Sequence, residues 1–147
     1  PLGIVHLKEL LNSGIYPLAY SKRALQLAVA VAGLVPVAAG LAGIFLGPGM
    51  IHLIGGASIP LDSHYRYLSG LLLGIGLGFW FTIPHIEREG RRVQLLTAIV
   101  VLGGLGRFWS LFTVGVPDRP MLFGLFMELA VTPLLALWQY RVAKDMS

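Results

Sequence analysis

Apolar residues are concentrated in four stretches of the chain, at positions 24–46, 67–83, 93–112 and 121–140. A helix needs about 20 predominantly apolar residues to cross the roughly 30 Å hydrocarbon core of a bilayer. Three stretches have about this length, and the second reaches it if its helix begins nearer His64. The pattern therefore predicts four transmembrane helices.

Residues 1–23 differ from these stretches because they mix apolar and polar residues, and the apolar ones have a spacing that suits a helix. This spacing predicts a short amphipathic helix that lies in the membrane interface. The following apolar run exceeds the 7–15 residues of a signal-peptide core, so we expect the first span to be retained. The expected fold is an all-α integral membrane bundle, with an interfacial segment at 1–23, a four-helix transmembrane domain at 24–140 and a short cytoplasmic tail at 141–147.

Composition supports an integral membrane protein. Hydrophobic residues make up 56% of the 147 residues and charged residues 12%, whereas soluble proteins have about 25% charged residues. There is no cysteine, which excludes disulfides, iron–sulfur clusters and thiolate nucleophiles. No two of the four histidines have the i, i+3 or i, i+4 spacing of helical metal ligands, so no metal site is predicted.

The formal net charge is +4, and the basic residues flank the apolar stretches. Lys and Arg accumulate on the cytoplasmic side of membrane proteins. One side holds eight of them and the other side three, which predicts a multi-pass protein of the bacterial inner membrane with both termini in the cytoplasm; the eight are Lys8, Lys22, Arg23, Arg88, Arg91, Arg92, Arg141 and Lys144. Because these charges orient the chain in lipid, no nucleic-acid partner is predicted.

Two charged residues, Arg107 and Glu128, lie inside apolar stretches. An unpaired charge in hydrocarbon costs about 2.5–3.5 kcal/mol on insertion scales. At 1.5 Å per residue, Arg107 is about 7–8 Å and Glu128 about 10 Å from the same, outer end of its span. We therefore expect the two side chains to pair across adjacent antiparallel helices.

Asp62, His64 and Arg66 precede the second span on the same outer side, and complete a candidate polar site with Arg107 and Glu128. One interpretation is a charge network that fixes helix register. Another is a pocket for an anionic head group, a quinone ring or a proton, because intramembrane ionisable groups often mark such sites. Catalysis would use Glu128 or His64 as acid or base. No nucleophile with an evident base is present, so no catalytic residue is assigned.

Glycines spaced four apart place small residues on one helix face and let backbones approach closely. Gly70, Gly74 and Gly78 have this spacing in the second span, and Gly43 and Gly47 form a further pair. We expect these faces to pack against other helices.

Three segments resemble a known family: Asp-Ser-His-Tyr-Arg-Tyr-Leu-Ser-Gly-Leu-Leu-Leu-Gly at 62–74, Gly-Gly-Leu-Gly-Arg at 103–107, and Met-Glu-Leu at 127–129 leading to Pro133. Together they are similar to the DUF4345 family of small bacterial membrane proteins. The resemblance implies a four-helix bundle, distantly similar to DoxX-like proteins, with Arg66, Arg107 and Glu128 at the family's polar positions. The family has no assigned activity, and residues 1–23 lie outside the resemblance.

These observations favour a noncatalytic accessory or scaffold subunit of a larger inner-membrane complex, with respiratory and photosynthetic assemblies as candidates. The expected partners are the lipid bilayer and other membrane subunits. The alternative is a binder or carrier of a small lipophilic or anionic molecule in an outer-facing polar pocket. No cofactor is predicted, and a lipid or quinone is the candidate bound molecule.

Overall fold

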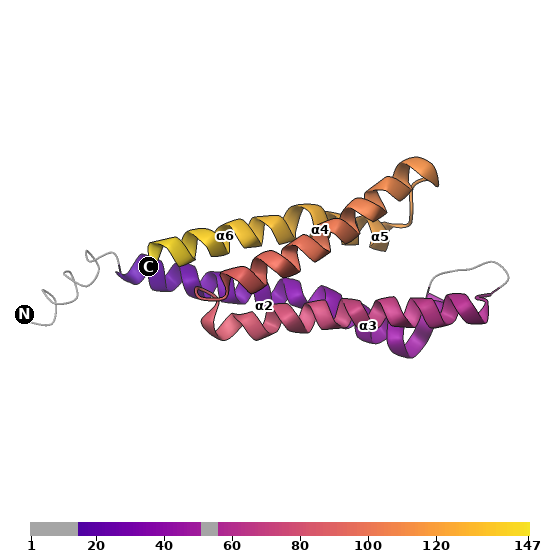
Figure 1. Cartoon of the computed structure of the whole chain (residues 1–147), viewed down its shortest axis with the longest axis horizontal. Helices are drawn as coiled ribbons and strands as arrows, with labels where there is room; N and C mark the ends of the chain where they lie inside the picture. Colours follow the sequence, from indigo (N-terminus) through magenta and orange to yellow (C-terminus); the bar gives the residue numbers. More distant parts are fainter. Residues whose placement is uncertain (1–14, 51–55) are drawn as a thin grey trace, which may run out of the picture. The chain divides into compact units, whose positions relative to one another are not determined.

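The computed structural model describes residues 15–50 and 56–147, and the regular elements in these ranges are helical. Four helices in the described ranges are long and apolar enough to cross a membrane: Ser21–Gly49, Ile59–His85, Gly90–Thr113 and Arg119–Asp145. For the described residues this confirms the predicted all-helical fold with four candidate membrane spans (Figure 1). Of the predicted interfacial segment, residues 1–14 lie outside the described residues, and from Ile15 the chain is part of helix α2 (Ile15–Leu46).

Two helices begin with the same local signal, a capping side chain followed by proline in the first turn. Ser58 accepts a hydrogen bond from the backbone N–H of Leu61 (3.4 Å) at the start of α3 (Ile59–Thr82). Asp118 accepts one from Met121 (3.4 Å) at the start of α5 (Arg119–Phe126). Such caps satisfy N–H groups that have no partner within the helix. The Ser58 cap starts the second span well before position 67, which gives it the length that the apolar stretch alone lacks.

Glycine ends the first helix. Gly47 has φ +63°, a left-handed conformation that glycine adopts at helix C-termini without steric cost. The chain then enters a short 3-10 turn, η1 (Gly47–Met50). Gly47 therefore terminates the helix, and it also lies against α3 together with Gly43. A Cβ at Gly43 would lie 2.7 Å from Cβ of Ser69, and one at Gly47 would lie 2.9 Å from Oδ1 of Asp62.

The last span is composite. After α5 comes a π-helical segment, η3 (Met127–Val131), and then α6 (Thr132–Asp145). Pro133 lacks an N–H and would clash with the carbonyl four residues earlier in a regular α-helix. The wider π turn relieves this conflict, and the Thr132 hydroxyl donates to the Met127 carbonyl (2.8 Å). Because α6 continues to Asp145, most of the predicted tail at 141–147 is helical.

One compact unit comprises residues 29–83, in which the C-terminal part of α2 runs along α3 (Figure 1). Glycines allow this approach: a Cβ at Gly40 would lie 2.7 Å from the backbone nitrogen of Leu73, and one at Gly76 would lie 2.7 Å from Cγ2 of Val37. The Trp80 indole donates to the Ala30 carbonyl (3.1 Å). Backbone-to-backbone packing of this kind is typical of membrane helices.

The expected glycine face of the second span is only partly used within the chain. Among the described atoms, a Cβ at Gly70 or Gly74 would meet none within 4 Å, whereas Gly76 packs against Val37 of α2. The spacing by four thus marks a face that is open in the described chain. The close contact instead uses the face on which Gly76 lies.

The other unit comprises the start of α2, up to Ala28, with residues 84–147. Here α4 (Gly90–Thr113) packs along α5, η3 and α6 (Figure 1). A Cβ at Gly104 would lie 2.8 Å from Cδ2 of Leu129 and 2.9 Å from Cβ of Glu128. Gly104 therefore lets α4 approach the π segment closely, one turn before Arg107.

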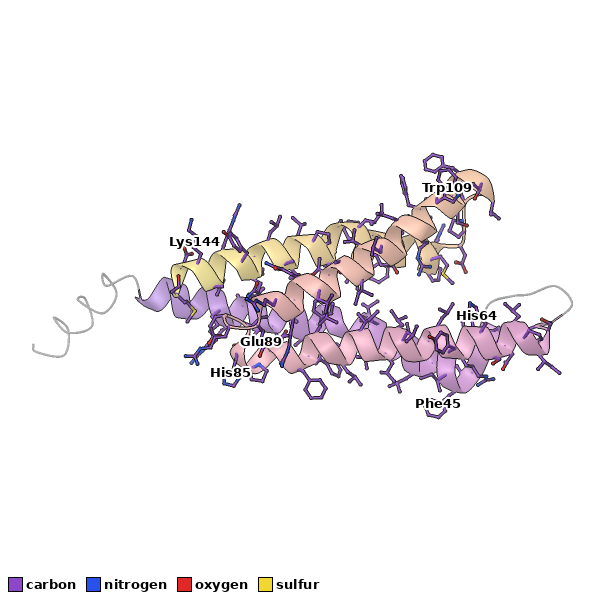
Figure 2. All side chains as sticks on the ribbon, in the orientation of Figure 1. Phe45, His64, His85, Glu89, Trp109 and Lys144 are labelled. Atoms are coloured by element: carbon purple, nitrogen blue, oxygen red, sulfur yellow. The ribbon has the colours of Figure 1, made fainter. Side chains whose placement is uncertain are left out.

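Many large apolar side chains lie on the outside of both units. Phe45 of α2 is 75% exposed and Trp109 of α4 is 70% exposed, and both point away from their helices (Figure 2). In water such a surface would drive association. In a bilayer it is the surface that lipid tails or other membrane helices cover.

Candidate functional site

Arg107 and Glu128 form a bidentate ion pair. Nε of Arg107 lies 3.0 Å from Oε2 of Glu128, and Nη2 lies 3.0 Å from Oε1. The side chains are 34% and 18% exposed. Two parallel charge-assisted hydrogen bonds are the strong form of this interaction and fix the relative orientation of the two groups. The pairing expected from the matched depths is therefore present.

Small residues on both helices make room for the pair. Gly104 lies one turn before Arg107, and its missing side chain leaves space for the backbone around Glu128. Gly124 lies one turn before Glu128, and a Cβ there would be 3.9 Å from Cζ of Arg107. The absence of a side chain at Gly104 and at Gly124 therefore leaves space for the Arg107 guanidinium to contact the Glu128 carboxylate.

The third nitrogen of the guanidinium also has a partner. Nη1 of Arg107 donates to the sulfur of Met121 at 2.9 Å. Thioether sulfur is a weak acceptor, but this contact completes the set, since Nε, Nη1 and Nη2 all contact groups of the same chain. Met121 was not predictable as a partner from the sequence, because methionine in an apolar stretch carries no polar signal.

Glu128 lies in the π segment η3. A π turn places an extra residue in one turn and alters the direction in which side chains project. Pro133 and Thr132, which favour this turn, follow Glu128 closely in the sequence. The position of the carboxylate is therefore set by an irregular turn, and such turns are frequent at functional sites.

A second ion pair lies in the unit of residues 29–83. Arg66 donates to Asp62 through Nε (2.8 Å to Oδ2) and Nη2 (3.1 Å to Oδ1). Nη1 of Arg66 donates to the Ile44 carbonyl and, at 3.3 Å, to the Phe45 carbonyl. The last carbonyls of a helix lack partners within it, so Arg66 caps the C-terminus of α2 and ties it to α3.

His64 does not join either ion pair in the described part of the chain. Its side chain is exposed, and its ring centroid lies 6.4 Å from that of Tyr67. Of the five residues predicted to form one polar site, the structure pairs Asp62 with Arg66 in one unit and Arg107 with Glu128 in the other. Their function as a binding site stays a prediction.

A polar cluster that the sequence argument missed joins the start of α2 to the turn after η2 (Ile83–His85) and to α6. Gln139 is buried, and its Nε2 donates to the Ile86 carbonyl (2.8 Å). The Trp138 indole donates to the Ser21 hydroxyl (3.2 Å). A glutamine inside an otherwise apolar helix was the available signal, since a buried amide requires partners.

The same cluster contains an ion pair whose carboxylate, on Glu87, lies between the second and third spans. Nζ of Lys22 lies 2.8 Å from Oε2 of Glu87. Burial by itself raises the pKa of the Glu87 carboxyl, but the hydrogen bond from Lys22 and the charges of Lys22 and Arg88 outweigh it, so the pKa lies below its ordinary value.

A lowered pKa means that the folded protein binds fewer protons than the unfolded chain in acid. The contribution of this pair, about 1 kcal/mol, is therefore expected in full above the ordinary pKa of 4.5 and lost as the pH falls below it. The free energy of unfolding, measured as the pH falls through 4.5, should decrease in the native sequence and decrease less in Glu87→Gln. Parallel pH profiles for the two proteins would contradict the assignment.

Among the described residues, no group of three His, Cys, Asp or Glu side chains is placed to hold a metal ion. In the Asp62–Arg66 and Arg107–Glu128 ion pairs, the arginine neutralises the charge of the carboxylate and orients it. Within a membrane, this arrangement makes ionisable groups tolerable and fixes how two helices face each other.

Four helices that are long and apolar enough to cross a membrane indicate the class, a multi-pass helical membrane protein. The family model described as "Domain of unknown function (DUF4345)" matches residues 24–139, and the chain belongs to that family. Neither a search of curated proteins nor a search of solved structures finds a match to this chain.

Proposed function

We propose that this protein is a noncatalytic accessory or scaffold subunit of a larger complex in the bacterial inner membrane, with both termini in the cytoplasm. The observation that carries the proposal is the internal pairing of both arginines on the outer half of the spans. Arg66 and Arg107 each use all three guanidinium nitrogens on groups of their own chain. Their role is then to hold helices together.

The exposed surface of the helices supports the same function. It is apolar, and two pairs of glycines on it face open space: Gly70 and Gly74 on α3, and Gly103 and Gly106 on α4. A small-residue face permits close approach by the helix of another subunit. Respiratory and photosynthetic assemblies, which are built largely from membrane helices, are the candidate complexes.

The test is to extract the protein from its native membrane in a mild detergent and to measure the mass and components of the particle. We expect a defined particle with other membrane subunits. The variant Gly70→Leu with Gly74→Leu should lose these companions without unfolding, because a Cβ at either position would meet no atom within 4 Å in the described part of the chain.

The matched control is Leu71→Ala with Leu77→Ala, which changes other exposed positions of α3 and should retain the companions. A small particle that holds only this chain would contradict the proposal, and so would companions that both variants retain.

The π turn at Glu128 favours one alternative, a binder or carrier of a small lipophilic or anionic molecule such as a lipid or a quinone. The Arg107 side chain is 34% exposed, so a ligand can reach the ion pair. This alternative requires a molecule that copurifies with the native protein at a fixed ratio and is lost from Glu128→Gln.

A further inference from the structure

Three helix ends meet in the unit that contains α4 and α6. Lys22 of α2 contacts Glu87 of the α3–α4 connection (2.8 Å). Gln139 of α6 donates to the Ile86 carbonyl (2.8 Å), and Trp138 donates to Ser21 (3.2 Å). The start of α2, the start of α4 and the last turns of α6 are therefore held at one end of this unit.

This end carries basic side chains that the local carboxylates do not neutralise. Glu87 pairs with Lys22, and Glu89 pairs with Arg92 (3.2 Å). The remaining exposed basic residues, which we call the basic collar, make no ion pair within the part of the chain that the structure describes; they are Arg23, Arg88, Arg91, Arg141 and Lys144. Among the described residues, Asp145 is the one other acid at this end, so the net charge of their exposed groups is positive.

An exposed apolar side chain lies one helical turn from each of three collar arginines, toward the middle of the span. Leu27 follows Arg23 by four residues and is 66% exposed, and Leu95 follows Arg91 by four and is 63% exposed. Leu137 precedes Arg141 by four and is 59% exposed. Residues four apart share a helix face, so a cation and an apolar side chain follow each other along the helix axis on three different helices.

Lys144 repeats the arrangement on α6. Tyr140 precedes it by four residues and is 58% exposed, and Lys144 points away from the ribbon (Figure 2). The same pairing of charge and apolar surface therefore occurs at four positions around one end of the unit.

We propose that the basic collar binds the head groups of anionic phospholipids, with their acyl chains along the exposed leucines. Arginine binds phosphate oxygens through two parallel hydrogen bonds, and basic residues at the membrane surface attract anionic lipids. A ligand that used charge alone would leave the adjacent leucines without a role. A phospholipid satisfies both halves of the arrangement, and this inference does not depend on the proposed scaffold function.

The experiment uses the full chain, purified in a neutral detergent and exposed to equal amounts of phosphatidylglycerol and phosphatidylcholine with identical acyl chains. Native mass spectrometry counts the lipids retained. We expect a preference for phosphatidylglycerol in the native sequence. Each arginine replaced by glutamine should weaken that retention about fivefold, and Arg23→Gln, Arg91→Gln and Arg141→Gln together should weaken it about a hundredfold.

Two control variants test whether a loss of lipid retention is caused by the removal of charge at these three positions. The same three positions changed to lysine keep the charge and should keep most of the preference. Arg119→Gln removes an exposed arginine from the other end of the unit and should bind as the native sequence does. Far-ultraviolet circular dichroism establishes that each variant is folded, and if the glutamine triple variant does not fold, the single variants provide the comparison.

Glycerol phosphate, which has the anionic group without acyl chains, tests the apolar half. It should displace phosphatidylglycerol only weakly. Equal retention of the two lipids, unchanged preference in the glutamine variants, or displacement by glycerol phosphate as effective as by phosphatidylglycerol would each overturn the proposal.

Discussion

Reversing the charge at position 107, Arg107→Glu, is expected to destabilise the folded protein by about 3 kcal/mol. The change places two carboxylates where the structure has a bidentate ion pair with 3.0 Å contacts. Removing one partner of a buried pair costs about 3–5 kcal/mol because the other charge remains without compensation. The lower value applies here, since the Arg107 side chain is 34% exposed.

The double exchange, Arg107→Glu with Glu128→Arg, separates a pair that fixes register from a specific site. If the pair only holds α4 against the last span, the exchange should recover at least half of the lost stability, which a double-mutant cycle measures directly. Unfolding can be followed by circular dichroism as denaturing detergent is added to mixed micelles. The loss of folding in each single variant and its partial return in the double variant are the expected outcome.

The matched control for this cycle is Arg119→Glu. Arg119 is exposed and makes no ion pair in the described part of the chain, so its reversal should change stability by less than about 0.5 kcal/mol. Single variants at 107 and 128 that are as stable as the native sequence would show that the pair is not structural. The ligand-binding alternative would then gain support.

A methyl group at position 40 should separate the helices of the 29–83 unit. In Gly40→Ala the new Cβ would lie 2.7 Å from the backbone nitrogen of Leu73 and 2.8 Å from the Ser69 carbonyl oxygen. Backbone atoms of a neighbouring helix cannot rotate away as a flexible side chain can. Overpacking of this kind costs about 1–3 kcal/mol, and the gain in helix propensity, about 1 kcal/mol, does not offset it at the upper end of that range.

Gly74→Ala is the matched control, since a Cβ at Gly74 meets nothing within 4 Å. It carries the same gain in helix propensity without the clash, so it should stabilise the unit or leave it unchanged. The same substitution is thus expected to lower the stability at position 40 and not to lower it at position 74 in the same unfolding assay. Equal effects at positions 40 and 74 would show that the approach of α2 to α3 is looser than the structure describes.

The hydrophobic pattern determined the number of spans, because a helix that crosses hydrocarbon must be about 20 residues long and apolar over most of that length. The burial cost of charge also made the Arg107–Glu128 pair predictable, since two isolated ionisable groups at similar depth have few other partners. These are properties of the chain and its solvent. They do not depend on how the helices are packed.

Helix limits were less predictable. The second span begins at Ile59 because Ser58 caps it. Its first turns carry Asp62, His64 and Arg66, which are polar, so hydropathy alone does not include them in the span. The last span continues to Asp145 although its final residues are polar. Capping and backbone hydrogen bonding extend helices beyond the apolar core, and average hydropathy does not register either.

The sequence by itself determined four helices long and apolar enough to cross a membrane, the ion pair between Arg107 and Glu128, and a family, because length, apolarity and isolated charge act locally along the chain. Only the tertiary structure decided which glycines pack, that Arg66 caps α2, that Glu128 lies in a π turn, and that Lys22 meets Glu87. Each of these depends on which faces of two helices meet, or on how a proline is accommodated within a turn. Residue spacing limits those choices but does not select among them.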